Sequence, residues 1–288
     1  MSKSIASNVV TTVKPSRIST EAGRHAKRAL WKRFSLSQYV FVFTIGFLFL
    51  PLLVLVIFSF NSTASMNWTG FSLRWYKGLM ESRELWRALK NSLIIAVTSA
   101  ATATVIGTIG AIGVSWYKFK MRAYVQTISF LPMILPEIII GVSLTIFFAG
   151  VGIKLGLLTI YIAHVTFNLP FVFLMVMARL DEFDFSIIEA AKDLGASERD
   201  TLFKVTLPIC MPGIISGLLT AITLSLEDFV ITFFVAGPGS TTLPIYIFSS
   251  FRRPDIRALV GPLSVVMIVG TVLLCIFLRK FLKYIAAK

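Results

Sequence analysis

Residues Glu189–Pro208, EAAKDLGASERDTLFKVTLP, form a polar segment between two long apolar runs. An apolar run of about 20 residues can cross a bilayer as a helix, so this polar segment is expected outside the membrane. Gly195 accepts the left-handed conformation that often ends a helix, and we expect it to close a short helix that starts near Asp184. Ser197 can cap a second short helix, which Pro208 is expected to end.

The composition of the chain is that of a membrane protein. Of its 288 residues, 56% are hydrophobic and only 15% are charged, whereas a soluble domain has about 25% charged residues. Six apolar runs predict six spans, at about Tyr39–Phe60, Asn91–Ser115, Tyr124–Ala149, Leu157–Met177, Pro212–Val235 and Leu259–Leu278. The predicted fold is an all-α polytopic membrane protein with six transmembrane helices and the polar loop between spans 4 and 5. A β-barrel would show alternating ten-residue segments instead.

The basic residues predict the orientation of the chain. We expect a basic tail at residues 1–38, a six-span domain at 39–280 with its polar loop at about 178–211, and a short end at 281–288. The tail is too long and too basic for a typical cleaved signal sequence. Nineteen Lys and Arg residues fall on the side of the tail, the polar loop and the C-terminus, and nine fall on the other side. This excess predicts that both termini and the loop are cytoplasmic.

Two spans have informative compositions. Span 2 is rich in Ala, Thr and Gly, and small residues let helices pack closely in lipid, so we expect this span to be central. Span 3 contains Pro132 and Pro136, which predict that it is broken. In span 4, His164 and Asn168 share one face and are expected to form hydrogen bonds between helices rather than to contact substrate.

The sequence lacks the residues of an ATP-hydrolysing enzyme. The glycine-rich stretch Gly237-Pro-Gly239 lacks the lysine of a phosphate-binding loop and is expected to form an external turn. The two cysteines and the two histidines match no metal-ligand spacing. The net charge of +14 comes from basic residues beside the spans, which argues against nucleic-acid binding. We therefore expect no catalytic residue, no metal site and no cofactor in this chain.

Three acids are predicted at membrane depth: Glu137 in span 3, and Glu227 and Asp228 in span 5. Each lies about 20 Å along its span, where a charge costs at least about 2.5–3.5 kcal/mol, so such residues usually face a polar cavity. Adjacent helical residues point about 100° apart, so at most one of the pair faces a path squarely. Together with Phe233 and Phe234, the acids predict a path for a cation. The alternative is a packing role, with each acid bonded to a neighbouring helix.

The polar loop resembles the "EAA" loop of ABC-importer membrane subunits. The matching residues are Glu189, Ala190, Ala191, Gly195, Val205, Leu207 and Pro208. In that family the loop is a coupling helix that docks into a cytoplasmic ATPase, which implies docking through Asp184, Glu189, Ala190, Ala191 and Gly195. The stretches Leu135–Ile138, His164–Leu180 and Ser225–Ile231 look like the spermidine/putrescine branch, where an acidic pair occupies the position of Glu227 and Asp228.

The resemblance implies that the chain is one subunit of a multi-subunit importer in a bacterial inner membrane. The chain would be a permease that pairs with a homologous second permease, with two cytoplasmic ATPase subunits that bind ATP and Mg, and with a periplasmic or extracellular substrate-binding protein. Opines or amino-acid-like solutes are the alternative to polyamines. An ion-coupled secondary transporter is a more distant alternative, because it would leave the coupling loop unexplained and because the paired broken helices of such folds are not evident. A structural or signalling membrane protein, with acids that serve only assembly, is another.

Overall fold

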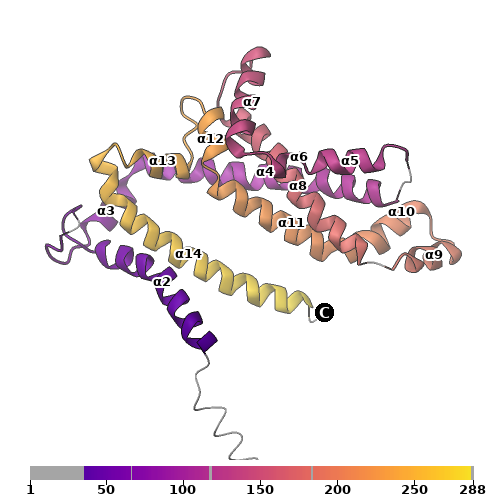
Figure 1. Cartoon of the computed structure of the whole chain (residues 1–288), viewed down its shortest axis with the longest axis horizontal. Helices are drawn as coiled ribbons and strands as arrows, with labels where there is room; N and C mark the ends of the chain where they lie inside the picture. The colour runs from indigo at the N-terminus through magenta and orange to yellow at the C-terminus, as the bar shows by residue number, and fades with distance from the viewer. Residues whose placement is uncertain (1–35, 66, 117–118, 183, 287–288) are drawn as a thin grey trace, which may run out of the picture. The chain divides into compact units, whose positions relative to one another are not determined.

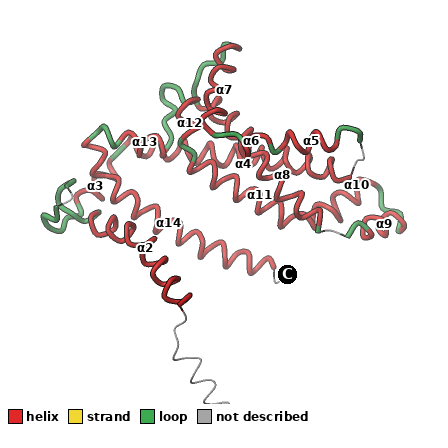
Figure 2. The backbone as a smooth tube through the Cα atoms, in the orientation of Figure 1, coloured by secondary structure: helices red, strands yellow, loops and turns green. Residues whose placement is uncertain are grey.

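A computed structural model describes residues 36–65, 67–116, 119–182 and 184–286. Throughout these residues the chain consists of helices joined by loops (Figure 2). It divides into two compact units, one up to Ile57 and one from Phe58 onward. The described part of the first unit, residues 36–57, belongs to helix α2, Leu36–Phe58, which is apolar along its length and contains Pro51. Most of the basic tail expected at residues 1–38 lies outside the described residues, so that boundary stays a prediction.

The helices of the second unit confirm the predicted all-α fold. They are α3 (Arg74–Glu81), α4 (Arg83–Trp116), α5 (Arg122–Ser129), α6 (Leu131–Ile134), α7 (Glu137–Gly150), α8 (Leu157–Asp181), α9 (Ser186–Asp193), α10 (Glu198–Asp200), a π-helical turn η1 (Thr201–Thr206), α11 (Leu207–Glu227), α12 (Val230–Val235), α13 (Leu243–Ser249) and α14 (Pro254–Ala286). Among the described residues of both units, five helices are long and apolar enough to span a membrane, or six when the bent pair α5–α6 and α7 counts as one span.

Helices α4, α8 and α11 pack side by side and form the core of the second unit (Figure 1). The contact depends on small residues, as predicted for span 2. A Cβ atom added at Gly107 in α4 would lie 2.9 Å from Val172 Cγ1 in α8, and one added at Gly217 in α11 would lie 3.2 Å from the Val172 Cα. Because neither glycine carries a side chain, the three backbones approach closely around Val172.

The predicted break in span 3 is present. Helices α5–α6 and α7 meet at 104°. Pro136 precedes α7 with an extended backbone at Leu135 (ψ 140°), which is the conformation that a following proline favours. Pro132 lies in the first turn of α6, directly after the junction with α5, where its missing N–H is not needed.

Span 5 differs from its prediction at both ends. It was expected as one helix from Pro212 to Val235, but the helix begins at Glu198, stops at Glu227 and resumes as α12 at Val230. Pro208 was expected to end a helix, and that prediction is wrong. It occupies the first turn of α11, and the π-helical turn η1 joins this helix to α10. The helix therefore continues from η1 through Pro208, which forgoes one backbone hydrogen bond there.

Candidate functional site

Two helix breaks bring the three predicted acids together. Glu137 is the first residue of α7, and Glu227 and Asp228 lie where α11 ends. Helix α7 packs on α12, with the Thr145 hydroxyl donating to the Phe234 carbonyl oxygen at 2.9 Å. In this arrangement Glu137 lies within electrostatic range of both other carboxylates. The three acids, called the acidic site below, therefore form one cluster although about 90 residues separate them.

The members of the acidic site differ in exposure. The side chains of Glu137 and Glu227 are exposed on the chain, whereas Asp228 is buried, with 8% of its surface accessible. A carboxylate that faced lipid at this depth would be costly, so the exposed pair suits a polar surface between subunits or along a path. Glu227 and Asp228 therefore differ in exposure, as expected for adjacent residues whose side chains point in different directions.

Asp228 is held by bonds within the chain. Its carboxylate accepts the backbone N–H groups of Ile231 at 3.2 Å and Thr232 at 2.8 Å, and the Thr232 hydroxyl at 2.5 Å. These N–H groups belong to the first turn of α12 and have no partner inside the helix. The carboxylate therefore caps α12, and this cap explains why the helix restarts immediately after the break.

His164 joins α8 to this cap. Its Nε2 lies 2.8 Å from the Thr232 hydroxyl and 3.2 Å from the Asp228 carboxylate, and its Nδ1 lies 2.6 Å from the Ser225 hydroxyl in α11. The Ser225 oxygen is 3.4 Å from the Ser99 hydroxyl in α4. The neutral tautomer with its proton on Nε2 is compatible with all these bonds. In it, the Ser99 hydroxyl donates to the Ser225 oxygen, and the Ser225 hydroxyl donates to Nδ1. The Nε2–H is then shared between the Thr232 oxygen and the Asp228 carboxylate. His164 therefore bonds between helices, as its position in span 4 predicts.

Asn168, one turn further along α8, does not match that expectation. It is fully buried, but neither its amide nitrogen nor its amide oxygen has a hydrogen-bond partner among the described residues. Its spacing from His164 places both residues on the same side of α8, but only His164 reaches a polar group on another helix. Helical spacing predicts a shared face, whereas the availability of a partner depends on the helix that packs there.

Phenylalanine rings lie beside the acidic site. The rings of Phe229 and Phe248 are 4.6 Å apart between centroids, and Phe233 lies 5.5 Å from Phe229. Phe233 is 52% exposed, whereas Phe234 packs on Gly141 of α7, where an added Cβ would lie 2.8 Å from the ring. Neither Phe229 nor Phe248 was predicted as a site residue from the sequence. Phe229 follows the acidic pair directly, and Phe248 belongs to α13, a helix inside the region expected to be an external loop.

Helix α9 lies in the expected coupling loop and has well-defined ends. The Ser186 backbone N–H donates to the Asp184 carboxylate at 2.9 Å, and this bond, with one from the Ser186 side chain, lowers the pKa of Asp184. At the other end, Gly195 has φ +85°. The N–H groups of Gly195 and Ala196 donate to the carbonyls of Lys192 and Ala191 at 2.9 and 3.0 Å. This is a Schellman motif, and it confirms the predicted role of glycine here.

A second short helix follows, as predicted. The Ser197 hydroxyl oxygen accepts the Asp200 N–H at 3.2 Å and caps α10. The loop is shorter than the 178–211 expected, because α8 continues to Asp181 and the helix that contains α11 begins at Glu198. The segment from 182 to 206 is called the coupling segment below.

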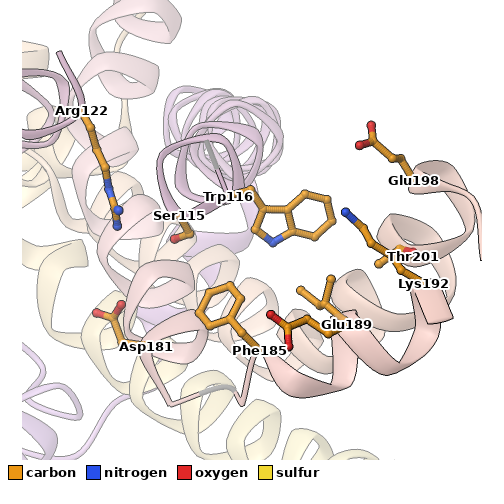
Figure 3. Close-up of a pocket in the computed structure, with 10 residues that line it drawn as sticks. Ser115, Trp116, Arg122, Asp181, Phe185, Glu189, Lys192, Glu198 and Thr201 are labelled. Carbon is orange, nitrogen blue, oxygen red and sulfur yellow. The ribbon is translucent and has the colours of Figure 1, made fainter. Parts of the chain in front are cut away.

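One face of α9 borders a pocket of about 600 Å³ at the ends of α4 and α8. The side chains of Glu189 and Phe185 point into this pocket near Trp116 (Figure 3). Asp184, Ala190 and Gly195 are exposed, and Ala191 is half-buried. Large apolar side chains of the coupling segment are also exposed, with Ile187 at 46%, Leu194 at 89% and Phe203 at 65%. These three residues were not predicted as site residues, although apolar side chains in a polar loop can indicate an interaction surface.

The described residues hold no group of three His, Cys, Asp or Glu side chains that could bind a metal ion. The stretch at Gly237 forms the expected turn, in which the Ser240 N–H donates to the Gly237 carbonyl at 3.1 Å and the Ser240 hydroxyl oxygen accepts the Gly237 N–H at 2.8 Å. Gly239 has φ +78°, which favours glycine.

Comparisons with known proteins agree with this architecture. The chain is 39% identical over 236 residues to the spermidine/putrescine transport system permease protein PotC of Escherichia coli K12, covering 80% of this chain and 89% of that protein. It is 42% identical over 233 residues to the putrescine transport system permease protein PotI of the same organism, covering 76% and 83%. Its fold is similar to that of a chain in the crystal structure of a bacterial ABC transporter involved in alginate import, with a TM-score of 0.69, 14% identity and coverage of 93% and 99%.

The family model of binding-protein-dependent transport system inner membrane components matches residues 103–288, which is more than half of the chain. Permeases of this family carry no cofactor and have no ATPase activity, and partner subunits hydrolyse ATP. The chain belongs to this family, and it is a multi-pass inner membrane permease subunit of a bacterial ABC importer.

Proposed function

We propose that this permease forms the translocation path for a polyamine such as spermidine or putrescine. The observation that carries the proposal is the acidic site, in which carboxylates from two distant spans meet at two helix breaks beside Phe233. A polyamine is a flexible chain of ammonium groups separated by methylenes. Clustered carboxylates lower the barrier for such a cation, and phenyl rings can contact both its methylenes and its ammonium groups. The names of the relatives at 39% and 42% identity support the same substrate class.

The residues of the acidic site divide into two roles in this proposal. The exposed carboxylates of Glu227 and Glu137 contact the ammonium groups, and Phe233 forms the aromatic wall. Asp228 adds negative charge from behind Glu227, where its oxygens are already bonded to groups of its own chain. Phe234 supports the site by packing on Gly141, which holds α12 against α7.

The coupling segment is proposed as the docking surface for a cytoplasmic ATPase subunit. Asp184, Glu189, Ala190, Ala191 and Gly195 lie on or beside α9, and Leu194 offers the most exposed large apolar side chain nearby. The alanines leave the α9 backbone open to close approach, and an apolar residue exposed in a polar segment is typical of an interaction surface. The complex would contain two such ATPase subunits and a second, homologous permease that completes the path.

The segment that follows α2 is proposed as a platform for the substrate-binding protein. Asn61 is fully buried, and its side-chain nitrogen donates to the carbonyls of Ser65 and Asn67 at 3.1 and 2.8 Å. Its side-chain oxygen accepts the Thr69 N–H at 2.9 Å. These bonds fix the loop and leave Phe71 69% exposed. An ordered loop with an exposed aromatic residue suits recognition of a protein partner.

Transport would then be a two-state switch biased by a ligand bound elsewhere. Closure of the ATPase pair on ATP would move the coupling segments, and the spans would alternate between inward-facing and outward-facing states. The chain contributes the path wall, the outer platform and the docking helix.

The test is ATP hydrolysis by the complete importer, reconstituted in lipid with its binding protein. Putrescine or spermidine should stimulate hydrolysis, and Glu227→Gln should raise the half-saturating polyamine concentration by about tenfold or more, because a charge-assisted contact is lost. Glu81→Gln, which alters an exposed carboxylate on α3 outside the acidic site, is the matched control. It should leave the half-saturating polyamine concentration unchanged. Stimulation by a neutral amino acid alone would overturn the polyamine proposal.

A further inference from the structure

His164 is a buried polar group for which the proposed path has no direct use. Only 2% of its surface is exposed, so it cannot contact a solute that passes along the chain. Both of its ring nitrogens have polar partners, which come from α11 and from the break that follows it. Burying a polar side chain is costly unless its hydrogen bonds are made, and a fully bonded buried side chain fixes the geometry of the groups around it.

The geometry that His164 fixes is that of the α11–α12 break. Asp228 leaves the helix with an extended backbone (φ −62°, ψ 120°), and its carboxylate caps α12. The direction of Glu227, the last residue of α11, depends on where this break lies. Among the described residues, His164 is the side chain from another helix that bonds the Asp228 carboxylate, so α8 holds the break through one imidazole ring.

The same break also places the second exposed acid. Helix α12 leaves the break and packs on α7 through the Thr145–Phe234 hydrogen bond and the close contact at Gly141. Glu137 begins α7. A shift of Asp228 would therefore move α12, and through it the end of α7 that carries Glu137.

We propose that His164 is a positioning residue for transport: through Asp228 it fixes the helix break and directs the Glu227 carboxylate toward the path. The inference rests on the proposed role of Glu227. It also explains why the network runs through four helices, since Ser99 in α4 and Ser225 in α11 orient the imidazole of α8 while its Nε2 holds the cap of α12. A purely structural histidine would stabilise the bundle without changing which way Glu227 points.

The accessibility of position 227 separates these two roles. The complete importer carries Glu227→Cys and Cys275→Ala, while Cys210 stays because it is fully buried. The probe is a trimethylammonium-bearing methanethiosulfonate, and the measurement is its rate of reaction with the new cysteine. With His164 intact we expect rapid labelling. His164→Ala should slow labelling by about tenfold, and His164→Gln, which keeps a donor near Asp228, should recover most of the rate.

Two further variants keep the test decisive. Ser225→Ala removes the partner of Nδ1 but leaves the imidazole in place, so it should slow labelling by about threefold even if His164→Ala fails to fold. Asn168→Ala is the matched control, because Asn168 is equally buried one turn away and has no hydrogen-bond partner among the described residues. It should leave the rate unchanged.

The outcomes distinguish this inference from the proposed function. Slow labelling with His164 intact would contradict the path role of Glu227. Rapid labelling that stays rapid in His164→Ala and Ser225→Ala would overturn the positioning role alone. A second readout is polyamine uptake, in which His164→Ala and Ser225→Ala should change the ratio of spermidine to putrescine transport. A structural defect would lower both rates equally.

Discussion

The carboxylate of Asp228 and the side chain of Leu194 lie in contrasting surroundings. Asp228 is 8% exposed and bonded to His164 and Thr232 of its own chain. Leu194, in the coupling segment, is an apolar side chain with 89% of its surface exposed. The buried part of the acidic site thus gets its geometry from within the chain, whereas the coupling segment exposes apolar side chains that the proposed ATPase partner would cover. A change in the first region should disturb the chain itself, and a change in the second should disturb assembly.

The largest effect is expected for Asp228→Leu. This change removes the cap of α12 and the acceptor of the Thr232 hydroxyl, and it leaves the His164 Nε2 with the Thr232 hydroxyl oxygen as its remaining partner. The chain should lose about 3 kcal/mol of stability, because one partner of a buried polar network is removed. Thermal unfolding of the purified permease in detergent checks this, and Glu81→Leu on the exposed surface of α3 is the control. An unchanged unfolding temperature would show that the network is dispensable.

Next in size is the effect of Ala191→Arg on assembly. Ala191 lies on α9, and a bulky cation there would clash with a docked partner or bury an unpaired charge. Association with the ATPase should fall by about 100-fold, measured by co-purification with a tagged ATPase subunit. The unfolding temperature of the permease alone should not change.

Lys192→Ala is the matched control for that variant. Lys192 is the neighbouring residue on α9 but lines the pocket on the side of α4 and α8 (Figure 3). It should retain association within about twofold, as expected for an exposed residue away from an interface hot spot. If both variants bound the ATPase equally, the contrast between the two regions would not hold.

A smaller effect is expected where α8 packs on α4. A Cβ atom at Gly107 would lie 2.9 Å from Val172 Cγ1, whereas one at Gly113 in the same helix would meet nothing within 4 Å. Gly107→Ala should lower stability by about 1–2 kcal/mol, and Gly113→Ala should raise it by up to about 1 kcal/mol. Because α8 carries His164, Gly107→Ala should also slow the labelling of the cysteine introduced by Glu227→Cys. Equal unfolding temperatures for the pair would argue against close packing.

The smallest effect is expected for Gly195→Ala. An added methyl group would meet nothing within 4 Å, but φ is +85°, a conformation that costs a non-glycine residue about 1 kcal/mol. The end of α9 should fray, and ATPase association should weaken by about fivefold, while the acidic site keeps its labelling rate. A loss of labelling at position 227 would mean that the two regions are more tightly coupled than their contacts indicate.

Local rules predicted the parts of the fold that depend on neighbouring residues. The break at Pro136, the Schellman motif at Gly195 and the cap at Ser197 follow from the chemistry of one residue and its sequence neighbours. The break after Glu227 was not predicted, because Asp228 lies inside a long apolar run that was expected to form one continuous helix. Its carboxylate ends the helix only because Thr232 and His164 lie within reach, and the contact with His164 depends on how α8 packs.

The acidic site was predicted in its members but not in its arrangement. Periodicity shows that adjacent residues point in different directions, which is why at most one of Glu227 and Asp228 was expected to face a path. Which of them is buried depends on the break, and the break is a tertiary feature. Phe248 was missed for a related reason, since α13 is a short helix that follows the turn-forming stretch at 237–242, and its contact with Phe229 is long-range in sequence.

The π-helical turn at Thr201–Thr206 sets the rotational phase between the coupling segment and α11. The Leu207 N–H bonds to the Leu202 carbonyl, five residues back, so the turn holds one residue more than an α-helical turn would. One residue corresponds to about 100° of rotation about the helix axis. Deleting a single residue here would leave every other side chain intact yet turn the preceding chain by about a quarter of a revolution. The number of residues between Gly195 and Pro208 therefore sets which face of α9 is turned toward the proposed ATPase partner.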